Sequence, residues 1–402
     1  MNNVPPRRAS LVLVTRDGRV LGRLPEMAVA TPWWQEVRPV LEAAREQFGL
    51  EAVILRLLKT ELPRPQGGGV IYLAEVGEPL PAGVIAALEP WTGPLDGQPL
   101  RLRWAEPGGP HADLAWAEDV ARARGLERTG AADQLRSWNL SSIWRLPLAD
   151  GAAWLKVVPP FFAHEGDMLR RLQGGPVPRL LGHDGDRILL ADVPGGDQYD
   201  AALPALLEMV SALVRLQAAW IGREDELLVT GLPDWRARAL TAAIADVVAR
   251  RGADLGPGRR ATLDGFVTAL PARFAAVEAC RLPDTFAHGD FHPGNVRGTP
   301  GNFVILDWGD CGVGHPLLDL SQFLDRVPPA VADQVRDHWL TEWRRAVPAS
   351  DPARAAELLA PVAAARQAVN YQLFVDSIEP VERRFHDADV TEWLERTAAL
   401  LP

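Results

Sequence analysis

Three polar side chains lie close together in the sequence between residues 286 and 309, where a loop precedes a short apolar run. Asp290 and Asn295 are five positions apart in a segment too rich in proline and glycine to be helical. Asp307 directly follows the apolar run 303–306, so it is expected at the end of a strand. Carboxylate and amide oxygens are ligands that suit Mg²⁺, usually together with phosphate oxygens. The spacing predicts a metal-binding site, whereas a surface turn rich in Asp and Asn explains only single residues.

The order of these residues resembles a known catalytic loop. Residues 288–295 (HGDFHPGN), followed by residues 307–309 (DWG), are similar to the catalytic loop and metal-binding triplet of protein-kinase-like enzymes. The particular form of the loop, together with residues 314–320 (GHPLLDL), resembles the aminoglycoside phosphotransferase and choline kinase family. The resemblance covers residues 135–402.

This resemblance implies an ATP-dependent phosphotransferase that moves the γ-phosphoryl group to a hydroxyl of a small molecule. Asp290 would accept the proton of that hydroxyl, and Asn295 and Asp307 would hold Mg²⁺. GTP is an open alternative to ATP. The other polar residues of the motif would hold the loop by hydrogen bonds: His288, His292 and Asp319.

A kinase site also requires a lysine on a strand and a glutamate on the next helix, both of which help to bind the nucleotide. Lys156 lies in the strand-like run 153–158, and Glu165 lies near the start of an expected helix over 162–172. Only Lys59 and Lys156 are lysines among the 42 basic residues, so each is a candidate for a role that arginine does not fill. A lysine facing water at a strand edge is the simpler alternative.

The expected nucleotide loop, residues 138–144, lacks the glycines that protein kinases carry there. Ser141 and Ser142 could offer hydroxyl and backbone N–H groups to phosphate. A plain connection between strands is the alternative.

Residues 189–196 resemble the hinge between the two lobes of a kinase. Backbone groups near Asp192 and Val193 would then bind adenine. The resemblance implies a two-lobed α+β fold, with a small β-rich N-lobe over 135–193 and a large helical C-lobe over 194–402.

The kinase-like region is preceded by a small α+β domain over residues 1–112 and a connecting helix or linker over 113–134. Residues 43–50 (AAREQFGL) resemble the end of a Nudix box, yet Glu46 alone cannot assemble its metal site. We therefore expect a Nudix-like fold without hydrolase activity, or an unrelated α+β domain. The expected elements here are strands 9–16, 19–24, 53–58 and 70–76 and a helix over 34–48.

The composition is that of an ordinary globular protein of 402 residues, with 47% hydrophobic and 23% charged residues and a net charge of −10. No Lys/Arg block indicates a nucleic-acid partner. Cys280 and Cys311 are too few for a disulfide framework, and no run is long enough for a membrane span. The sequence thus favours a cytoplasmic protein without nucleic-acid or membrane partners, of undetermined oligomeric state.

The acceptor is expected to be a hydroxyl-bearing small molecule, with cationic molecules among the candidates. Five carboxylates near the C-terminus could form an acidic wall for it: Asp376, Glu379, Glu382, Asp387 and Asp389. Two other functions stay open. One is a non-catalytic nucleotide-binding or regulatory module, and the other is a metal-dependent hydrolase using His288, Asp290, His292 and Asp307.

Overall fold

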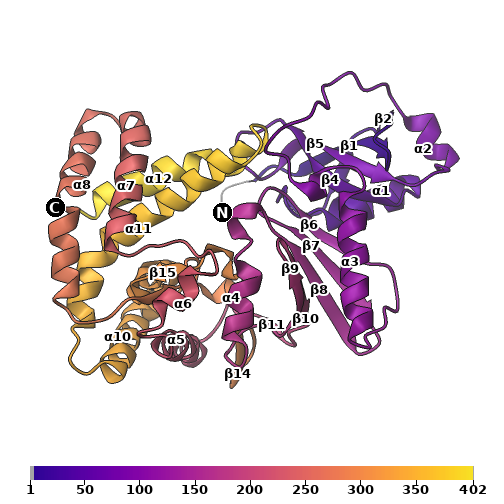
Figure 1. Cartoon of the computed structure of the whole chain (residues 1–402). Coiled ribbons are helices and arrows are strands. Elements are labelled where there is room, and N and C mark those ends of the chain that lie inside the picture. Colours follow the sequence, from indigo (N-terminus) through magenta and orange to yellow (C-terminus); the bar gives the residue numbers. More distant parts are fainter. Residues whose placement is uncertain (1–3, 402) are drawn as a thin grey trace. The chain divides into compact units, whose positions relative to one another are not determined.

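The computed structural model describes residues 4–401, which form two compact units (Figure 1). Unit 1 contains Met1–Ala163, Leu180–Asp192 and Asp376–Phe385. Unit 2 contains His164–Arg179, Val193–Val375 and His386–Pro402. The chain passes from unit 1 to unit 2 between Asp192 and Val193, within the segment expected to be a hinge.

Unit 1 begins with a mixed five-stranded sheet. Its strands are β1 (Arg7–Thr15), β2 (Val20–Arg23), β3 (Met27–Val29), β4 (Ala52–Thr60) and β5 (Gly68–Val76). The order is β2-β1-β5-β4, with β3 also paired to β1, and only β1 and β5 run parallel. Leu11 and Leu13 of β1 are buried in one cluster, whereas Val12 and Val14 are buried in another. Both faces of this sheet are therefore covered, which explains the continuous apolar run in β1.

One face of the sheet is covered by helix α1 (Arg38–Phe48), which buries Val40 and Ala44. The helix was expected from residue 34 but begins at Arg38, because Trp34 is buried and its indole N–H donates to the Gly67 carbonyl. Gly49 ends the helix in a left-handed conformation, as predicted. Glu46 lies exposed on α1, and the Nudix-like character of this region stays a prediction.

A second five-stranded sheet follows in unit 1. It contains β6 (Asp133–Ser137), β7 (Ser142–Leu148), β8 (Gly151–Val157), β9 (Leu180–Asp184) and β10 (Arg187–Ala191). The order is β6-β7-β8-β10-β9, and every neighbouring pair is antiparallel. Helix α3 (Gly109–Ala123) lies along this sheet and buries Ala117 and Ala121 in a cluster with Leu155 and Leu189 (Figure 1). The short elements α2 (Ala82–Ala87) and η1 (Arg103–Ala105) precede α3.

Unit 2 is mainly helical. Its helices are α4 (Glu165–Leu172), α5 (Leu203–Ala218), α6 (Glu224–Leu228), α7 (Ala237–Arg251), α8 (Pro257–Glu278), α9 (Leu320–Leu324), α10 (Pro329–Ala346), most of α11 (Pro352–Ser377) and α12 (Asp387–Ala399). Two small sheets lie among them, one of β12 (Thr285–Ala287) and β15 (Gly312–Gly314), the other of β11 (Gly196–Asp197), β13 (Val296–Thr299) and β14 (Asn302–Ile305). A strand-rich part followed by a helix-rich part is the predicted α+β class.

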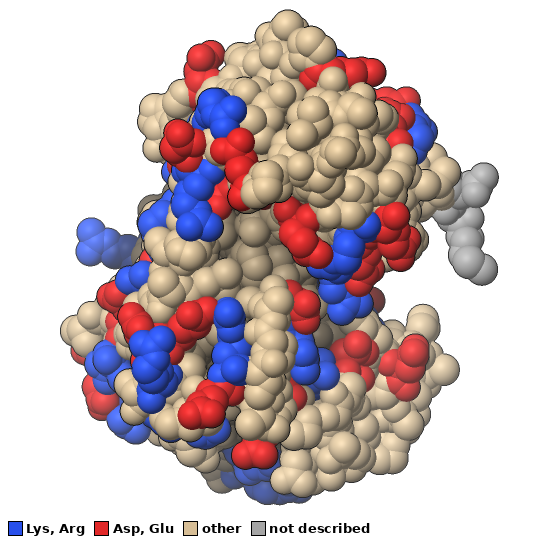
Figure 2. Space-filling model, turned by 90° about the vertical axis from the view of Figure 1, so that its right-hand side faces the viewer, with Lys and Arg blue, Asp and Glu red and all other residues tan. Residues whose placement is uncertain are grey.

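Acidic and basic side chains are interspersed on the face shown in Figure 2, without a large field of one sign. Many charged side chains of the described residues form exposed ion pairs, such as Arg122 with Asp119 at 2.6 Å. None of the helices within residues 4–401 combines the length and apolar content that a bilayer-spanning helix needs.

Candidate active site

The loop over residues 288–295 leaves β12 through a tight turn at Gly289. Gly289 has a φ of +88°, in the left-handed region that favours glycine. A Cβ atom at this position would lie 1.9 Å from the carbonyl oxygen of Asp310. The turn therefore requires glycine, because a side chain has neither the conformation nor the space.

Asp319 fixes the backbone of this turn. Its carboxylate accepts the N–H groups of His288 and Gly289, both at 2.8 Å, and the side-chain amide of Gln217 at 3.1 Å. Burial raises the pKa of Asp319 to about 6, although the two backbone N–H groups act in the opposite direction. Asp319 thus holds the loop through hydrogen bonds to its backbone, which is the role expected for it.

The two histidines of the motif are occupied with the backbone. His288 Nε2 lies 2.9 Å from the Leu306 carbonyl, and Nδ1 accepts the Asp290 N–H at 3.3 Å. Nε2 must then carry the proton, and burial lowers the pKa of His288 to about 4, so the ring stays neutral. His292 Nδ1 accepts the Gly294 N–H at 3.0 Å. Both residues shape the loop.

The side chain of Asn295 is oriented by hydrogen bonds to Asp290, the expected base. Its side-chain N–H₂ donates to the backbone oxygen of Asp290 at 2.9 Å and to Asp290 Oδ2 at 3.0 Å. Because the amide nitrogen faces Asp290, the amide oxygen of Asn295 is the atom left to bind a cation. Asp290 itself is about one-third exposed, with a side-chain accessibility of 38%.

Asn295 directly precedes β13, and Asp307 follows β14 at the same end of the hairpin. The Leu306 N–H donates to the Asn295 carbonyl at 2.7 Å, which places the next residue, Asp307, at the same end of the hairpin. Asp307 is exposed and left-handed, with φ 63° and ψ 67°. Non-glycine residues rarely adopt this conformation, and it is commonly found at functional sites. The hairpin therefore brings together the two residues expected to hold Mg²⁺.

Trp308 anchors the strained turn at Asp307, and Glu165 accepts a hydrogen bond from the Trp308 backbone. Trp308 is fully buried, and its indole N–H donates to the Ile305 carbonyl at 2.9 Å. Its backbone N–H donates to Glu165 Oε1 at 3.2 Å. The first residue of α4 is thus connected to the residue after Asp307, a role that the sequence did not predict.

Helix α11 supplies a second support that sequence reasoning missed. Arg366 Nη2 donates to the Gly289 carbonyl at 2.5 Å, and the Gln367 amide donates to the same oxygen at 3.1 Å. Arg366 is fully buried and its guanidinium lies over the Trp235 ring, 4.3 Å from the centroid. Asn370 donates to Asp310 Oδ1 at 3.2 Å. Polar residues at 366, 367 and 370, directly after the apolar run 358–365 of α11, are the sequence signal that could have revealed this face.

Lys156 lies on β8 in unit 1, half-buried, between β7 and β10. It pairs across the sheet with Ile143 on one side and Ile188 on the other. The alternative of a lysine at a sheet edge is therefore wrong, because β8 is an inner strand. The expected partnership of Lys156 with Glu165 stays a prediction.

Two backbone groups of the expected hinge already form hydrogen bonds within the chain. The Asp192 N–H donates to the Ala152 carbonyl at 3.2 Å, and the Val193 carbonyl accepts from Arg297 Nε at 2.8 Å. Adenine binding by the backbone of Asp192 and Val193 stays a prediction.

Ser141 and Ser142 are buried, and both hydroxyls accept from indole groups. Trp138 Nε1 donates to Ser141 Oγ at 3.1 Å, and Trp144 Nε1 donates to Ser142 Oγ at 3.0 Å. Both hydroxyls thus have a structural role, and their contact with phosphate stays a prediction.

The five C-terminal carboxylates do not form one solvated wall. Glu379 and Glu382 are buried in unit 1, and Glu379 forms an ion pair with Arg101 at 3.0 Å. Asp387 and Asp389 belong to α12 in unit 2. The expected acidic wall is therefore wrong as a single surface.

The interpretation as a metal hydrolase is also not supported. Within residues 4–401, no group of three or more His, Cys, Asp or Glu side chains could hold a metal ion. Both ring nitrogens of His288 bond to the backbone, so the ring cannot also bind a metal.

Taken together, the loop over residues 288–295 and the two small sheets of unit 2 have the arrangement expected of a protein-kinase-like phosphotransferase. The family model described as "phosphotransferase enzyme family" (APH) matches residues 135–358, more than half of the 402 residues. The chain belongs to this family and is a small-molecule kinase.

Solved structures share the fold at low sequence identity. The GDP complex of wild-type aminoglycoside 2'-phosphotransferase-IIIa is 15% identical, with a TM-score of 0.50 over 71% of this chain and 98% of that chain. A choline/ethanolamine kinase family protein from Mesorhizobium loti is 17% identical, with a TM-score of 0.49 over 72% and 94%. A fructosamine-3-kinase homologue from Thermobifida fusca is 21% identical, with a TM-score of 0.47 over 70% and 98%. No curated protein sequence matches the chain.

Proposed function

We propose that this protein transfers the γ-phosphoryl group of ATP to a hydroxyl group of a small molecule, with Asp290 as the base. The observation that carries this proposal is the contact between the Asn295 amide and Asp290 Oδ2 at 3.0 Å, in a hairpin that also bears Asp307. The proposed base and the two proposed oxygen ligands then all belong to residues 290–307 of unit 2.

In the proposed reaction, the acceptor oxygen forms a bond to the γ-phosphorus. The bond from that phosphorus to the oxygen bridging the β- and γ-phosphates breaks, and ADP leaves. The proton of the hydroxyl passes to the Asp290 carboxylate. Positioning and charge neutralisation supply most of the catalysis in such reactions, so an ordinary carboxylate is a sufficient base.

Asn295 and Asp307 fit the needs of Mg²⁺. The amide oxygen of Asn295 is turned away from Asp290, and the Asp307 carboxylate is exposed. Mg²⁺ commonly takes one or two such protein oxygens and completes its shell with phosphate and water. When bound, the ion would neutralise the negative charge of the phosphates.

Lys156 is proposed to contact the nucleotide phosphates and to pair with Glu165, and the backbone of Asp192 and Val193 to bind adenine. The fold shared with aminoglycoside 2'-phosphotransferase-IIIa, which was solved with GDP, supports nucleotide use. That complex also keeps GTP open as the phosphoryl donor.

The acceptor is proposed to be a hydroxyl-bearing small molecule. Aminoglycosides, the class named for the relative with a TM-score of 0.50, carry amino groups as well as hydroxyls. Amino-bearing acceptors are therefore the first to test, although the predicted acidic wall no longer supports them.

The test is a panel of hydroxyl-bearing acceptors incubated with the full-length protein, ATP and Mg²⁺, with phosphorylated products identified by mass spectrometry. We expect at least one acceptor to gain a phosphoryl group, and chelation of Mg²⁺ to abolish the product. Products that form equally well in excess chelator would contradict the proposed metal role. Absence of nucleotide binding would overturn the proposal as a whole.

A further inference from the structure

The loop over residues 138–141 joins β6 to β7 without any glycine. Ser137 and Ser142 pair across the base of the loop, so it is a four-residue hairpin connection. Among the non-glycine residues of the described part of the chain, only Arg281 and Asp307 have left-handed backbones. The loop therefore needs no glycine, and its shape is set by its contacts.

The first contacts come from the N-terminal sheet. The side chain of Gln134 on β6 both donates to and accepts from the backbone of Ile54 on β4, at 2.8 Å each. Ser137 Oγ donates to the Leu55 carbonyl at 3.2 Å, and the Ser137 N–H donates to the Gln35 carbonyl at 3.3 Å. The strand that leads into the loop is thus fixed to β4.

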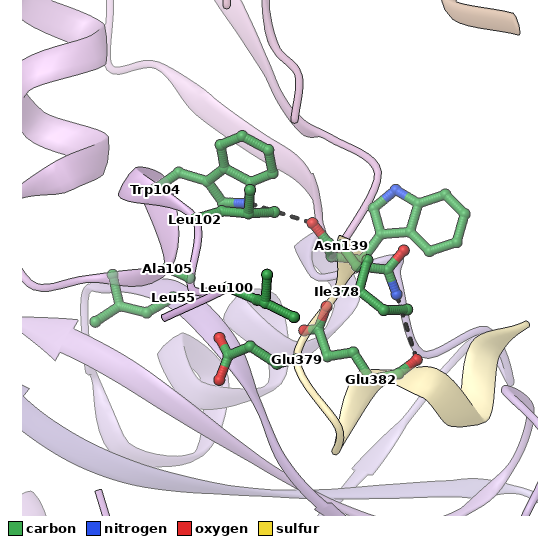
Figure 3. A pocket seen from close by; sticks show the side chains of 10 residues that line it. Leu55, Leu100, Leu102, Trp104, Ala105, Asn139, Ile378, Glu379 and Glu382 are labelled. Carbon is green, nitrogen blue, oxygen red and sulfur yellow. Dashed lines mark hydrogen bonds between the residues drawn. The ribbon is translucent and has the colours of Figure 1, made fainter. Parts of the chain in front are cut away.

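Further contacts come from residues 376–385, a stretch near the C-terminus that belongs to unit 1 and that we call the return segment. The Phe385 ring packs edge-to-face against Trp138 of the loop at 5.5 Å and against Trp34 at 5.7 Å. The Asn139 side-chain amide donates to the backbone carbonyl of Glu382 at 3.4 Å (Figure 3). The return segment, more than 230 positions away along the chain, thus contacts the loop at the Trp138 ring and at the Asn139 amide.

Glu382 lies between the N-terminal sheet and the loop. It is 6% exposed, and it lines one small pocket together with Leu55 of β4 and Asn139 of the loop (Figure 3). The Trp104 indole donates to the Trp138 carbonyl at 3.2 Å and closes the same small pocket (Figure 3). Asn139 itself is 1% exposed, so its amide is committed to these partners.

We propose that Asn139 and Glu382 are positioning residues that hold the 138–141 loop in the shape that binds the nucleotide. The inference rests on the proposed function, because it takes this loop as the nucleotide loop. A glycine-rich loop loses much conformational freedom when it closes on phosphate. A loop already ordered by the return segment and the N-terminal sheet loses less, so the ordering favours nucleotide affinity.

The inference predicts a change in nucleotide affinity without a matching change in turnover. In the full-length protein, Asn139→Ala should raise the KM for ATP about tenfold and leave kcat within about twofold, as expected for the loss of one loop-ordering hydrogen bond. Glu382→Ala should raise the KM similarly. Glu382→Gln keeps the size of the side chain and a neutral hydrogen-bonding group, and it should restore most of the affinity.

The matched control is Glu42→Gln, on the exposed face of α1 in the same unit, where Glu42 pairs with Arg38 at 3.2 Å. It should change neither KM nor kcat, because exposed ion pairs contribute little. A merely destabilised protein would show a lower kcat through loss of active molecules, with an unchanged KM.

Binding of a non-hydrolysable ATP analogue, measured by calorimetry, separates the possible failures. If the parent binds the analogue and Asn139→Ala binds it equally well, the inference is wrong and the proposed function stands. If the parent protein does not bind the ATP analogue, the inference and the proposed function are both wrong. Should Glu382→Ala fail to fold, Asn139→Ala decides the question alone, because it removes only one amide group.

Discussion

Asp307 combines an exposed carboxylate with a backbone conformation that an aspartate rarely adopts. Its φ of 63° is held by the turn that Trp308 anchors through its indole and backbone N–H groups. Such a conformation costs a non-glycine residue about 1–2 kcal/mol. This strained position carries a carboxylate rather than glycine, although glycine would be more stable there. We take this as support for the proposed role of Asp307 in holding Mg²⁺.

The variant Asp307→Gly tests this assignment. Glycine adopts the same backbone conformation without strain, so the melting temperature should stay equal or rise. The kcat for phosphoryl transfer should fall by about 10²-fold or more, because the carboxylate that neutralises phosphate charge is lost. Thermal unfolding and steady-state kinetics give the two readouts.

The control for Asp307→Gly is Arg281→Gly, the other left-handed non-glycine position in the described chain, with a φ of 58°. It should relieve similar backbone strain and leave kcat unchanged. Equal kcat values in both variants would show that Asp307 has no part in the reaction.

At the residue scale, the sequence was informative about Asp290, Asn295 and Asp307 because all three lie within eighteen positions of one another. Their proposed roles come from this local pattern and from the family that it resembles. The contact of Glu165 with Trp308 spans 143 positions, and nothing in the sequence pairs these two residues. The burial of Ser141 and Ser142 and their hydrogen bonds to two tryptophans were not predicted, because they depend on packing.

At the scale of elements, α11 holds the catalytic loop through one carbonyl group. Arg366 and Gln367 both donate to the Gly289 oxygen, next to the proposed base. Burial lowers the pKa of Arg366, whereas the nearby carboxylates of Asp319 and Asp310 act to raise it. A buried cation that supports a loop in this way is costly to remove, because its partners lose their compensation.

Arg366→Met should therefore lower the free energy of unfolding by about 3 kcal/mol and reduce kcat through displacement of the loop. Urea denaturation and steady-state kinetics measure the two effects. Arg354→Met is the control on the same helix, since Arg354 is exposed and pairs with Glu357 at 2.9 Å. Equal stabilities of the two variants would contradict the supporting role of Arg366.

Strands with a long apolar run were predicted within a few residues of their ends, such as β1 and β5, whereas the helix expected over 34–48 begins only at Arg38. No strand was predicted at β6 or β9, which are five-residue strands of mixed polarity. Such strands are stabilised by their neighbours in the sheet, and short segments carry little periodicity of their own.

At the scale of the whole molecule, unit 1 is assembled from three stretches of chain that are far apart in sequence. The third stretch, the return segment, carries Glu382 into a setting where burial raises its pKa to about 8. Glu379 adds to the shift, and Arg56 opposes it. This assembly could not be predicted from the sequence, because residues 376–385 look like an exposed acidic stretch.

Glu382 should make the stability of the protein depend on pH. Its pKa is about 8 in the folded state against an ordinary value of 4.5, so the folded state binds more protons between these values. The free energy of unfolding should fall as pH rises from about 5 to 8, by up to about 1.4 kcal/mol per pH unit. Denaturation of Glu382→Gln should lack this component, while the exposed Glu42→Gln should retain it. Parallel pH profiles for parent and Glu382→Gln would refute the assignment.

The central claim is that Asp290 performs the chemistry of phosphoryl transfer, and Asp290→Asn tests it most directly. Affinity for ATP with Mg²⁺ and single-turnover phosphorylation of an acceptor are measured on the same preparation. We predict that ATP binds with nearly the parental affinity while the transfer rate falls by about 10²- to 10⁴-fold, the effect of losing a general base. A variant that transfers phosphate at the parental rate would contradict the account.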